Sequence, residues 1–164
     1  MNAVRLILVS AAVLAVLVSS AAVAELTPSK PSDLVTAYQD TGPACPGGGL
    51  PGARLIESRL LADGTTIPFA IPAGHVFVIT GVEVLLISAP DTSSMVHVGI
   101  PCGDGCMVYM FNLGVNVTSF GRGTSTLQLT NGVAVKPGVT LCSTGAAREV
   151  NAFATLRGYF AKDK

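Results

Sequence analysis

HVFVITGVEVLLIS, residues 75–88, is a run of β-branched and aliphatic residues that lacks the periodicity of a helix. Such residues favour a β-strand, in which successive side chains point to opposite faces of the sheet. The even positions from Val76 to Leu86 are almost all apolar, whereas the odd positions are mixed. We therefore expect the even side chains to face the core. Gly81 divides the run and predicts a bulge or a bend in the strand.

Shorter runs of similar composition lie on both sides of this strand and are separated by Gly, Pro, Asn and Asp. This spacing is typical of a β-sandwich or a barrel. The predicted strands are residues 53–61, 65–71, 75–88, 94–100, 106–113, 123–130, 132–136, 139–142 and 149–160.

Three predicted turns set the direction of these strands. Asn131-Gly132 matches a two-residue type I′ hairpin, Pro137-Gly138 matches a type II turn, and Ala62-Asp63-Gly64 separates two apolar runs. Turns this short join antiparallel neighbours, because parallel strands need long crossover connections.

The strand count favours one kind of sandwich. An immunoglobulin core would be expected to contain a Trp between two Cys residues, and this chain has no Trp. Eight or nine strands of uneven length suit a jelly roll better. The sequence thus predicts an all-β fold, a single antiparallel, jelly-roll-like β-sandwich over residues 53–164.

The first 24 residues have the pattern of a signal peptide. Arg5 precedes an apolar run over residues 6–18, and Ala22-Val23-Ala24 provides the small side chains that a signal peptidase requires. Cleavage would leave Glu25 as the new N-terminus, and no later segment is long and apolar enough to span a membrane. The alternative is an uncleaved anchor over residues 6–24. We expect a secreted or periplasmic protein.

Residues 25–52 are rich in Pro and Gly and predict an arm or linker ahead of the sandwich. One short helix could begin at the Pro31-Ser32-Asp33 cap and continue through Leu34 to Tyr38.

The chain has 164 residues, with ten basic and ten acidic side chains and a formal net charge of +0. A balanced charge of this kind excludes a basic stripe for nucleic acid. We therefore expect no nucleic-acid partner.

All four cysteines lie after the signal peptide, where an oxidising compartment favours disulfides. Cys102 and Cys106 can face each other across a three-residue hairpin loop, within disulfide reach. Cys45 would then pair with Cys142. A redox or zinc site is the weaker interpretation, because the spacing is C-x3-C and His75 and His97 are the only histidines.

The predicted strand over residues 106–113 is apolar on both faces, so a loop, the arm or another subunit must cover the second face. With charge so sparse, a homo-oligomer is a reasonable hypothesis. Tyr109 and Phe111 are the only aromatic residues two positions apart on one strand face. They are the candidates for an exposed interaction patch, with packing in the core as the favoured alternative.

No sequence motif points to catalysis, a metal ion or another cofactor. A small hydrolase could use His97, Asp104 and Ser125, but Ser125 does not lie in a G-x-S-x-G motif. A carbohydrate-binding module would be expected to present aromatic platforms, and aromatic residues are only 5% of the chain. Glu83, a charge on an apolar strand, could pair with Arg157 or Arg59, blunt a sheet edge, or contact a ligand.

The sequence therefore predicts an exported, disulfide-stabilised β-sandwich that acts as a non-catalytic binding or assembly module. Its ligand would be a protein or a glycan. The two alternatives are the hydrolase with residues near His97 and Asp104, and the carbohydrate-binding module.

Overall fold

The computed structural model of the chain describes residues 28, 33–39, 43–46, 52–103, 105–146 and 151–163. The predicted signal peptide, residues 1–24, and the loop residue Asp104 lie outside these residues. The strands are β1 Leu34–Tyr38, β2 Arg54–Leu55, β3 Ser58–Leu60, β4 Thr66–Pro68, β5 His75–Ile87, β6 Ser93–Gly103, β7 Cys106–Asn116, β8 Arg122–Val135, β9 Cys142–Gly145 and β10 Asn151–Lys162.

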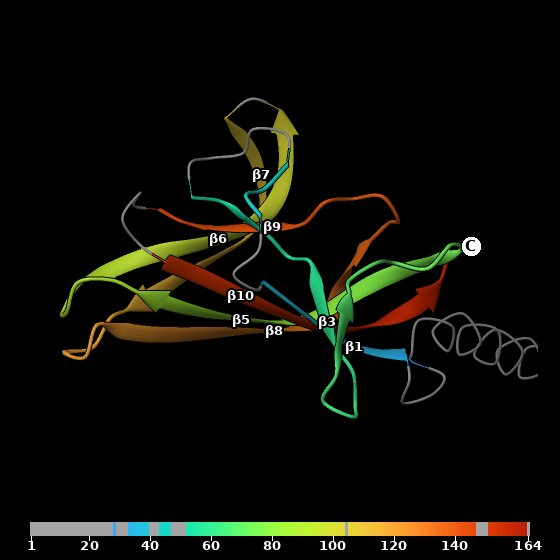
Figure 1. Ribbon diagram of the computed structural model, residues 1–164, viewed down its shortest axis with the longest axis horizontal. Helices are drawn as coiled ribbons and strands as arrows, with labels where there is room; N and C mark the ends of the chain where they lie inside the picture. The colour runs from blue at the N-terminus through green and yellow to red at the C-terminus, as the bar shows by residue number, and fades with distance from the viewer. Residues whose placement is uncertain are drawn as a thin grey trace, which may run out of the picture.

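The strands form two antiparallel sheets (Figure 1). The larger sheet has the order β4-β3-β1-β10-β5-β8, and the smaller has the order β2-β9-β6-β7. Without the β3–β4 hairpin, the remaining strands form two four-stranded sheets, β1-β10-β5-β8 and β2-β9-β6-β7, which is the arrangement of a jelly roll. The prediction of an all-β antiparallel sandwich is confirmed, and β3–β4 is an insertion that widens one sheet.

The core lies between the two sheets and is built from alternate residues of the long strands. Leu156 of β10 and Val84 of β5 meet Val96 of β6 and Phe111 of β7 in one buried cluster. Burial of this kind stabilises the fold by about 1.5–3 kcal/mol for each large aliphatic or aromatic side chain. The inward faces of the two sheets thus form one continuous core.

A bulge at Thr80 changes which face of β5 points inward. Gly81 lies opposite Arg157, whereas Ile79 lies opposite Gly158, so Thr80 is an extra residue in the ladder with β10. After the bulge the even residues face the core, as predicted. Before it the odd residues do, and Val78 instead joins a small cluster outside the main core. The predicted interruption at Gly81 is confirmed, but an even inward face over the whole strand is wrong.

Asn131-Gly132 does not form the predicted hairpin. β8 continues through both residues, and both of its halves pair with β5: Gln128 lies opposite Gly81, and Val133 lies opposite Ile79. Gly132 keeps the positive φ of 67° that the hairpin would have required. The reason is that β5 is long enough to pair with both halves of β8, one on each side of the bulge at Thr80.

The segment from Leu34 to Tyr38 is a strand, not the short helix considered above. β1 pairs with β10 on one side and with β3 on the other, and its alternate residues Val35 and Ala37 are buried. Pairing on both sides outweighs the local helix signal, because β-propensity depends on packing against neighbours.

The predicted strand over residues 53–61 is two strands in different sheets. β2 pairs with β9 in the smaller sheet, and β3 pairs with β1 and β4 in the larger one. The turns on Asp63-Gly64 and Pro137-Gly138 are confirmed, since Gly64 and Gly138 have φ angles of 84° and 80°. Val139 N–H donates to the carbonyl oxygen of Lys136 across the second turn.

Candidate functional site

The inserted β3–β4 hairpin creates a hollow at one end of the sandwich. The hairpin extends the larger sheet beyond β1. Residues of β3 and β4 share a space of about 650 Å³ with the end of β2 and with the connection between β8 and β9. The lining residues are Leu55, Ile56, Glu57, Ser58, Thr66, Ile67, Pro68, Phe69, Ala70, Ile71, Gly138, Val139, Thr140 and Leu141.

Backbone hydrogen bonds connect the segments that line this hollow. Ile56 N–H donates to the carbonyl oxygen of Leu141 at 2.9 Å, which ties the crossing between β2 and β3 to the β8–β9 connection. Phe69 N–H donates to the carbonyl oxygen of Glu57. The Phe69 ring packs edge-on against Phe77, with 5.3 Å between ring centroids. The hollow therefore rests directly on the core.

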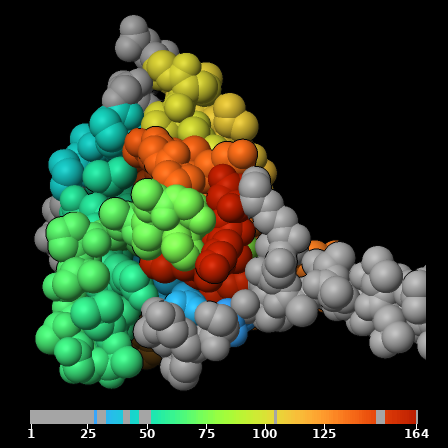
Figure 2. Space-filling model, turned by 90° about the vertical axis from the view of Figure 1, so that its right-hand side faces the viewer, coloured from blue at the N-terminus to red at the C-terminus, as the bar shows by residue number. Residues whose placement is uncertain are grey.

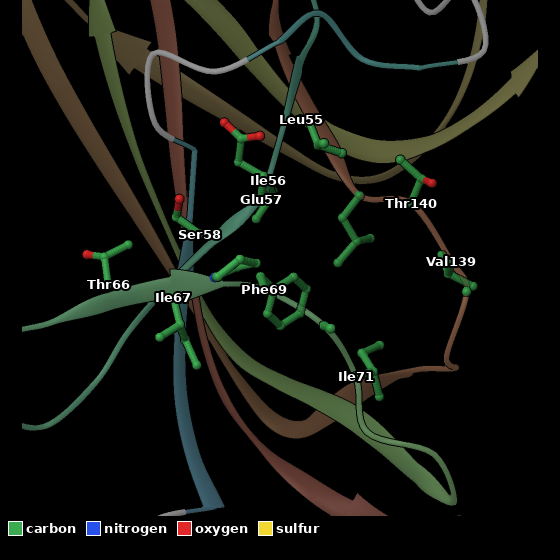
Figure 3. Close-up of a pocket in the computed structure, with 14 residues that line it drawn as sticks. Leu55, Ile56, Glu57, Ser58, Thr66, Ile67, Phe69, Ile71, Val139 and Thr140 are labelled. Carbon is green, nitrogen blue, oxygen red and sulfur yellow. The ribbon is translucent and has the colours of Figure 1, made fainter.

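Most of the lining residues have apolar side chains, and polar groups lie among them. Figure 3 shows Phe69, Ile71 and Val139 around the space, with Thr66 and Thr140 on opposite sides of it. Glu57 is the one charged residue among the lining residues. In Figure 2 the segment after β4 (green) lies against the residues near 140 (orange) on one surface of the molecule. A pocket with an apolar wall and a few polar groups is suited to bind a small molecule.

Hydrogen bonds to Asp63 stabilise the turn that closes the β3–β4 hairpin. Asp63 Oδ1 accepts hydrogen bonds from the hydroxyl and the backbone N–H of Thr65, at 2.7 and 2.9 Å. The side-chain bond first, and the backbone bond second, lower the pKa of Asp63 from its ordinary value. The charged carboxylate thus stabilises the hairpin that forms one wall of the hollow.

The predicted patch of Tyr109 and Phe111 does not exist as one surface. Val98 lies opposite Phe111 and Gly99 opposite Tyr109, so Met110 is an extra residue between them. This bulge turns Phe111 into the core, where it is 6% exposed, and leaves Tyr109 42% exposed. Phe111 is therefore removed from the patch, and Tyr109 keeps its exposed position.

Tyr109 stacks on His97, a residue that the hydrolase alternative required. The two rings are 4.3 Å apart at an angle of 17°, and His97 Nδ1 lies 2.6 Å from Asn112 Oδ1. Ser125 lies on the other sheet, opposite the buried Val84. The structure does not bring His97 and Ser125 together, and Asp104 lies outside the described residues. The described part of the chain therefore assembles no part of that triad.

The structure joins Cys45 to Cys142, with 6.0 Å between their Cα atoms, and Cys102 to Cys106, with 5.2 Å. The first bridge is buried in a small cluster with Met107 and Ala53. The second closes the exposed tip of the β6–β7 hairpin. The two bridges thus lie in very different surroundings.

Glu83 pairs with Arg157, one of the two arginines considered above, at 2.9 Å. The two side chains are 45% and 62% exposed, so water screens their attraction and the pair contributes little to stability. Among the residues that the structure describes, no cluster of three or more His, Cys, Asp or Glu side chains could hold a metal ion. Across the same residues, no helix has the length and hydropathy of a membrane span.

Sequence reasoning missed the hollow. Its walls come from residues 55–71 and 138–141, which are far apart in the chain and form no motif. A signal was present in the run TTIPFAIP, residues 65–72, where Pro68 argues against a central strand and the apolar residues still need a partner.

The chain was compared with families, curated proteins and solved structures. No family model matches the sequence, and no curated protein matches it. Among solved structures, the chain is similar to the cryo-EM structure of the virus-like particle of extra small virus from the giant freshwater prawn Macrobrachium rosenbergii, with a TM-score of 0.39 and 12% sequence identity, over 85% of this chain and 86% of that chain.

Proposed function

We propose that the protein is an exported, non-catalytic binding module that holds a small apolar ligand in the hollow beside the β3–β4 hairpin. The observation that carries this proposal is the hollow of about 650 Å³, lined mainly by apolar side chains. Its volume lies within the roughly 300–1,000 Å³ typical of ligand pockets.

The lining determines the class of ligand. Phe69, Ile71 and Val139 supply apolar contact area, and Thr140 supplies a hydroxyl group, whereas the Thr66 hydroxyl is already hydrogen-bonded to Tyr38. The lining contains no basic residue that could pair with a carboxylate on the ligand. The ligand is therefore an apolar molecule with a neutral or cationic polar group, and free fatty acids bind poorly.

Export is supported by the N-terminal sequence and by the two disulfides. Residues 1–24 follow the pattern of a signal peptide, and disulfides persist in oxidising compartments outside the cytosol. Both features agree with a secreted or periplasmic binding protein.

Binding is tested with N-phenyl-1-naphthylamine, a neutral apolar fluorophore, titrated into the protein purified after expression of the full chain. The expected result is saturable binding of one probe per chain. Val139→Phe fills the hollow and should weaken binding at least tenfold, a loss of about 1.4 kcal/mol. Leu34→Phe adds the same ring at an exposed site outside the lining and should bind like the unchanged protein.

The proposal fails if the probe does not saturate, or if both variants bind equally well. Should Val139→Phe not fold, as judged by circular dichroism, Ala70→Phe at the exposed side of the hollow serves the same purpose. Its binding should fall in the same way.

Export is tested by sequencing the N-terminus of the protein recovered outside the cytosol. The expected first residue is Glu25. Ala24→Arg should block cleavage, because the peptidase pocket accepts only small side chains. A mature protein that still begins at Met1 would contradict this part of the proposal.

A further inference from the structure

We propose that the free edge of β7 pairs with β7 of a second copy of this chain, which joins two four-stranded sheets into one continuous eight-stranded sheet. β7 is the last strand of the smaller sheet, and its ladder partner is β6. An unpaired edge presents a row of backbone N–H and C=O groups that can pair with another strand.

Among the described residues, the other edges of the two sheets are protected, whereas no strand pairs with the outer edge of β7. β4 has three residues and contains Pro68, which cannot donate a ladder hydrogen bond. β8 carries Arg122 and is broken by its irregular register with β5. β2 has two residues and is bridged on its outer side by Ala44. β7 has eleven residues, CMVYMFNLGVN, with no charge and no Pro.

Only part of β7 is available for pairing. Near its C-terminal end β8 lies close, since a side chain at Gly123 would collide with Val115 and Asn116. Toward the hairpin tip the strand rises away from the sandwich (Figure 1). Here Val108 is 58% exposed and Tyr109 is 42% exposed. The segment that remains for edge pairing is therefore Cys106–Met110, in which the Met107 side chain is buried against Cys45 and Ala53.

Two contacts already order this segment in the single chain. The disulfide between Cys102 and Cys106 closes the hairpin at its tip. Stacking on His97 orients the Tyr109 ring, so the ring loses little rotational freedom on binding. A rigid edge with exposed apolar side chains reduces the entropy cost of association.

A second copy is the occupant that this edge fits. In an antiparallel pair related by a two-fold axis, the same residues are contributed by both copies. Cys106–Met110 contains no charged side chain, so a second copy meets no like charge. A foreign strand would be selected by charges or side-chain pockets, and the segment offers no charge for such selection.

The test is the molar mass in solution, measured by size-exclusion chromatography with light scattering from about 1 to about 100 μM protein. The unchanged protein should have the mass of two chains at the upper end of this range. Val108→Lys places a charge on the edge and should shift the mass to one chain. Leu34→Lys is the matched control, since Leu34 is 57% exposed and lies outside β7, and it should remain a dimer.

Hydrogen exchange locates the contact. Backbone amides of residues 106–110 should exchange more slowly in the dimer than in Val108→Lys. If Val108→Lys does not fold, Tyr109→Lys replaces it with the same expectation. A monomer at every concentration, a dimer that survives substitution at Val108, a dimer lost equally in Leu34→Lys, or unchanged exchange at residues 106–110 would each overturn the proposal.

Discussion

The hydroxyl group of Ser143 donates a hydrogen bond to the side-chain carbonyl oxygen of Gln39, and this bond joins the two sheets through the interior. Gln39 follows β1 of the larger sheet, and Ser143 lies in β9 of the smaller one. Both residues are buried. Gln39 Nε2 also donates to the carbonyl oxygen of Ala152 at 3.0 Å. Both ends of the buried amide are thus satisfied.

Ser143→Ala should lower the free energy of unfolding by about 1–3 kcal/mol, because it leaves a buried carbonyl oxygen without a donor. Urea unfolding followed by circular dichroism measures the loss. The double variant Ser143→Ala with Gln39→Leu should be more stable than the sum of the single losses implies. Additive losses in this cycle would contradict the hydrogen bond.

The two disulfides should differ in their contribution to stability. Replacing Cys45 and Cys142 by Ser opens a loop with a sequence separation of 97 residues, and replacing Cys102 and Cys106 opens one of 4. Loop-closure entropy predicts losses of nearly 5 and about 2 kcal/mol respectively, measured by urea unfolding. Equal losses in the two double variants would show that loop length does not control them.

The same two disulfides should also differ in how readily a mild reductant opens them. Cys102 and Cys106 are exposed, whereas Cys142 is fully buried and Cys45 nearly so. Iodoacetamide added with a low concentration of reductant should label Cys102 and Cys106 first, as read by mass spectrometry of the peptides. Earlier labelling of Cys45 would contradict its burial.

Gly158→Ala should destabilise the fold by about 1–3 kcal/mol, the usual cost of overpacking. A Cβ atom there would collide with the carbonyl oxygen of Val78 and lie 2.8 Å from the ring of Phe77. Gly114→Ala is the control, because its Cβ would meet the sulfur of Met95 at an ordinary 3.7 Å. Thermal unfolding compares them, and similar midpoints would contradict the close packing at Gly158.

The turn at Asp63 should make stability depend on pH in the acid range. The folded-state pKa of Asp63 lies below its ordinary value. The charged carboxylate therefore stabilises the fold above the unfolded pKa of about 3.9, and this contribution is lost as the pH falls through the folded pKa. Thr65→Val removes the hydroxyl donor and should raise the pKa of Asp63, read from its carboxyl carbon by NMR titration. An unchanged titration would contradict the hydrogen bond.

Much of the fold could be predicted from the sequence because alternation and turn residues are local signals. The run at residues 75–88 predicted the strand that lies between β10 and β8, and Gly81 marked the place of its bulge. What alternation could not reveal was that Thr80 and Met110 each add one residue to a ladder. One extra residue reverses the faces of the strand on one side of it. Hence Val78 lies outside the main core, and Tyr109 and Phe111 lie on different faces instead of one.

Other differences arose because pairing between distant strands outweighs local preference. Asn131-Gly132 is a strong hairpin signal, yet the neighbouring strand β5 holds both halves of β8. The hollow was the hardest feature to predict from the sequence, since it depends on how the β3–β4 hairpin lies relative to the β8–β9 connection. That information belongs to the strand order and not to any residue type.

The crossing between β2 and β3 has a mechanical consequence. Leu55 pairs in one sheet and Ser58 in the other, so the chain passes from layer to layer within three positions. Such a short tether cannot lengthen, and the layers cannot hinge apart along this margin. If a ligand binds as proposed, it must therefore enter a space that exists beforehand, and its uptake should leave the spacing of the layers unchanged.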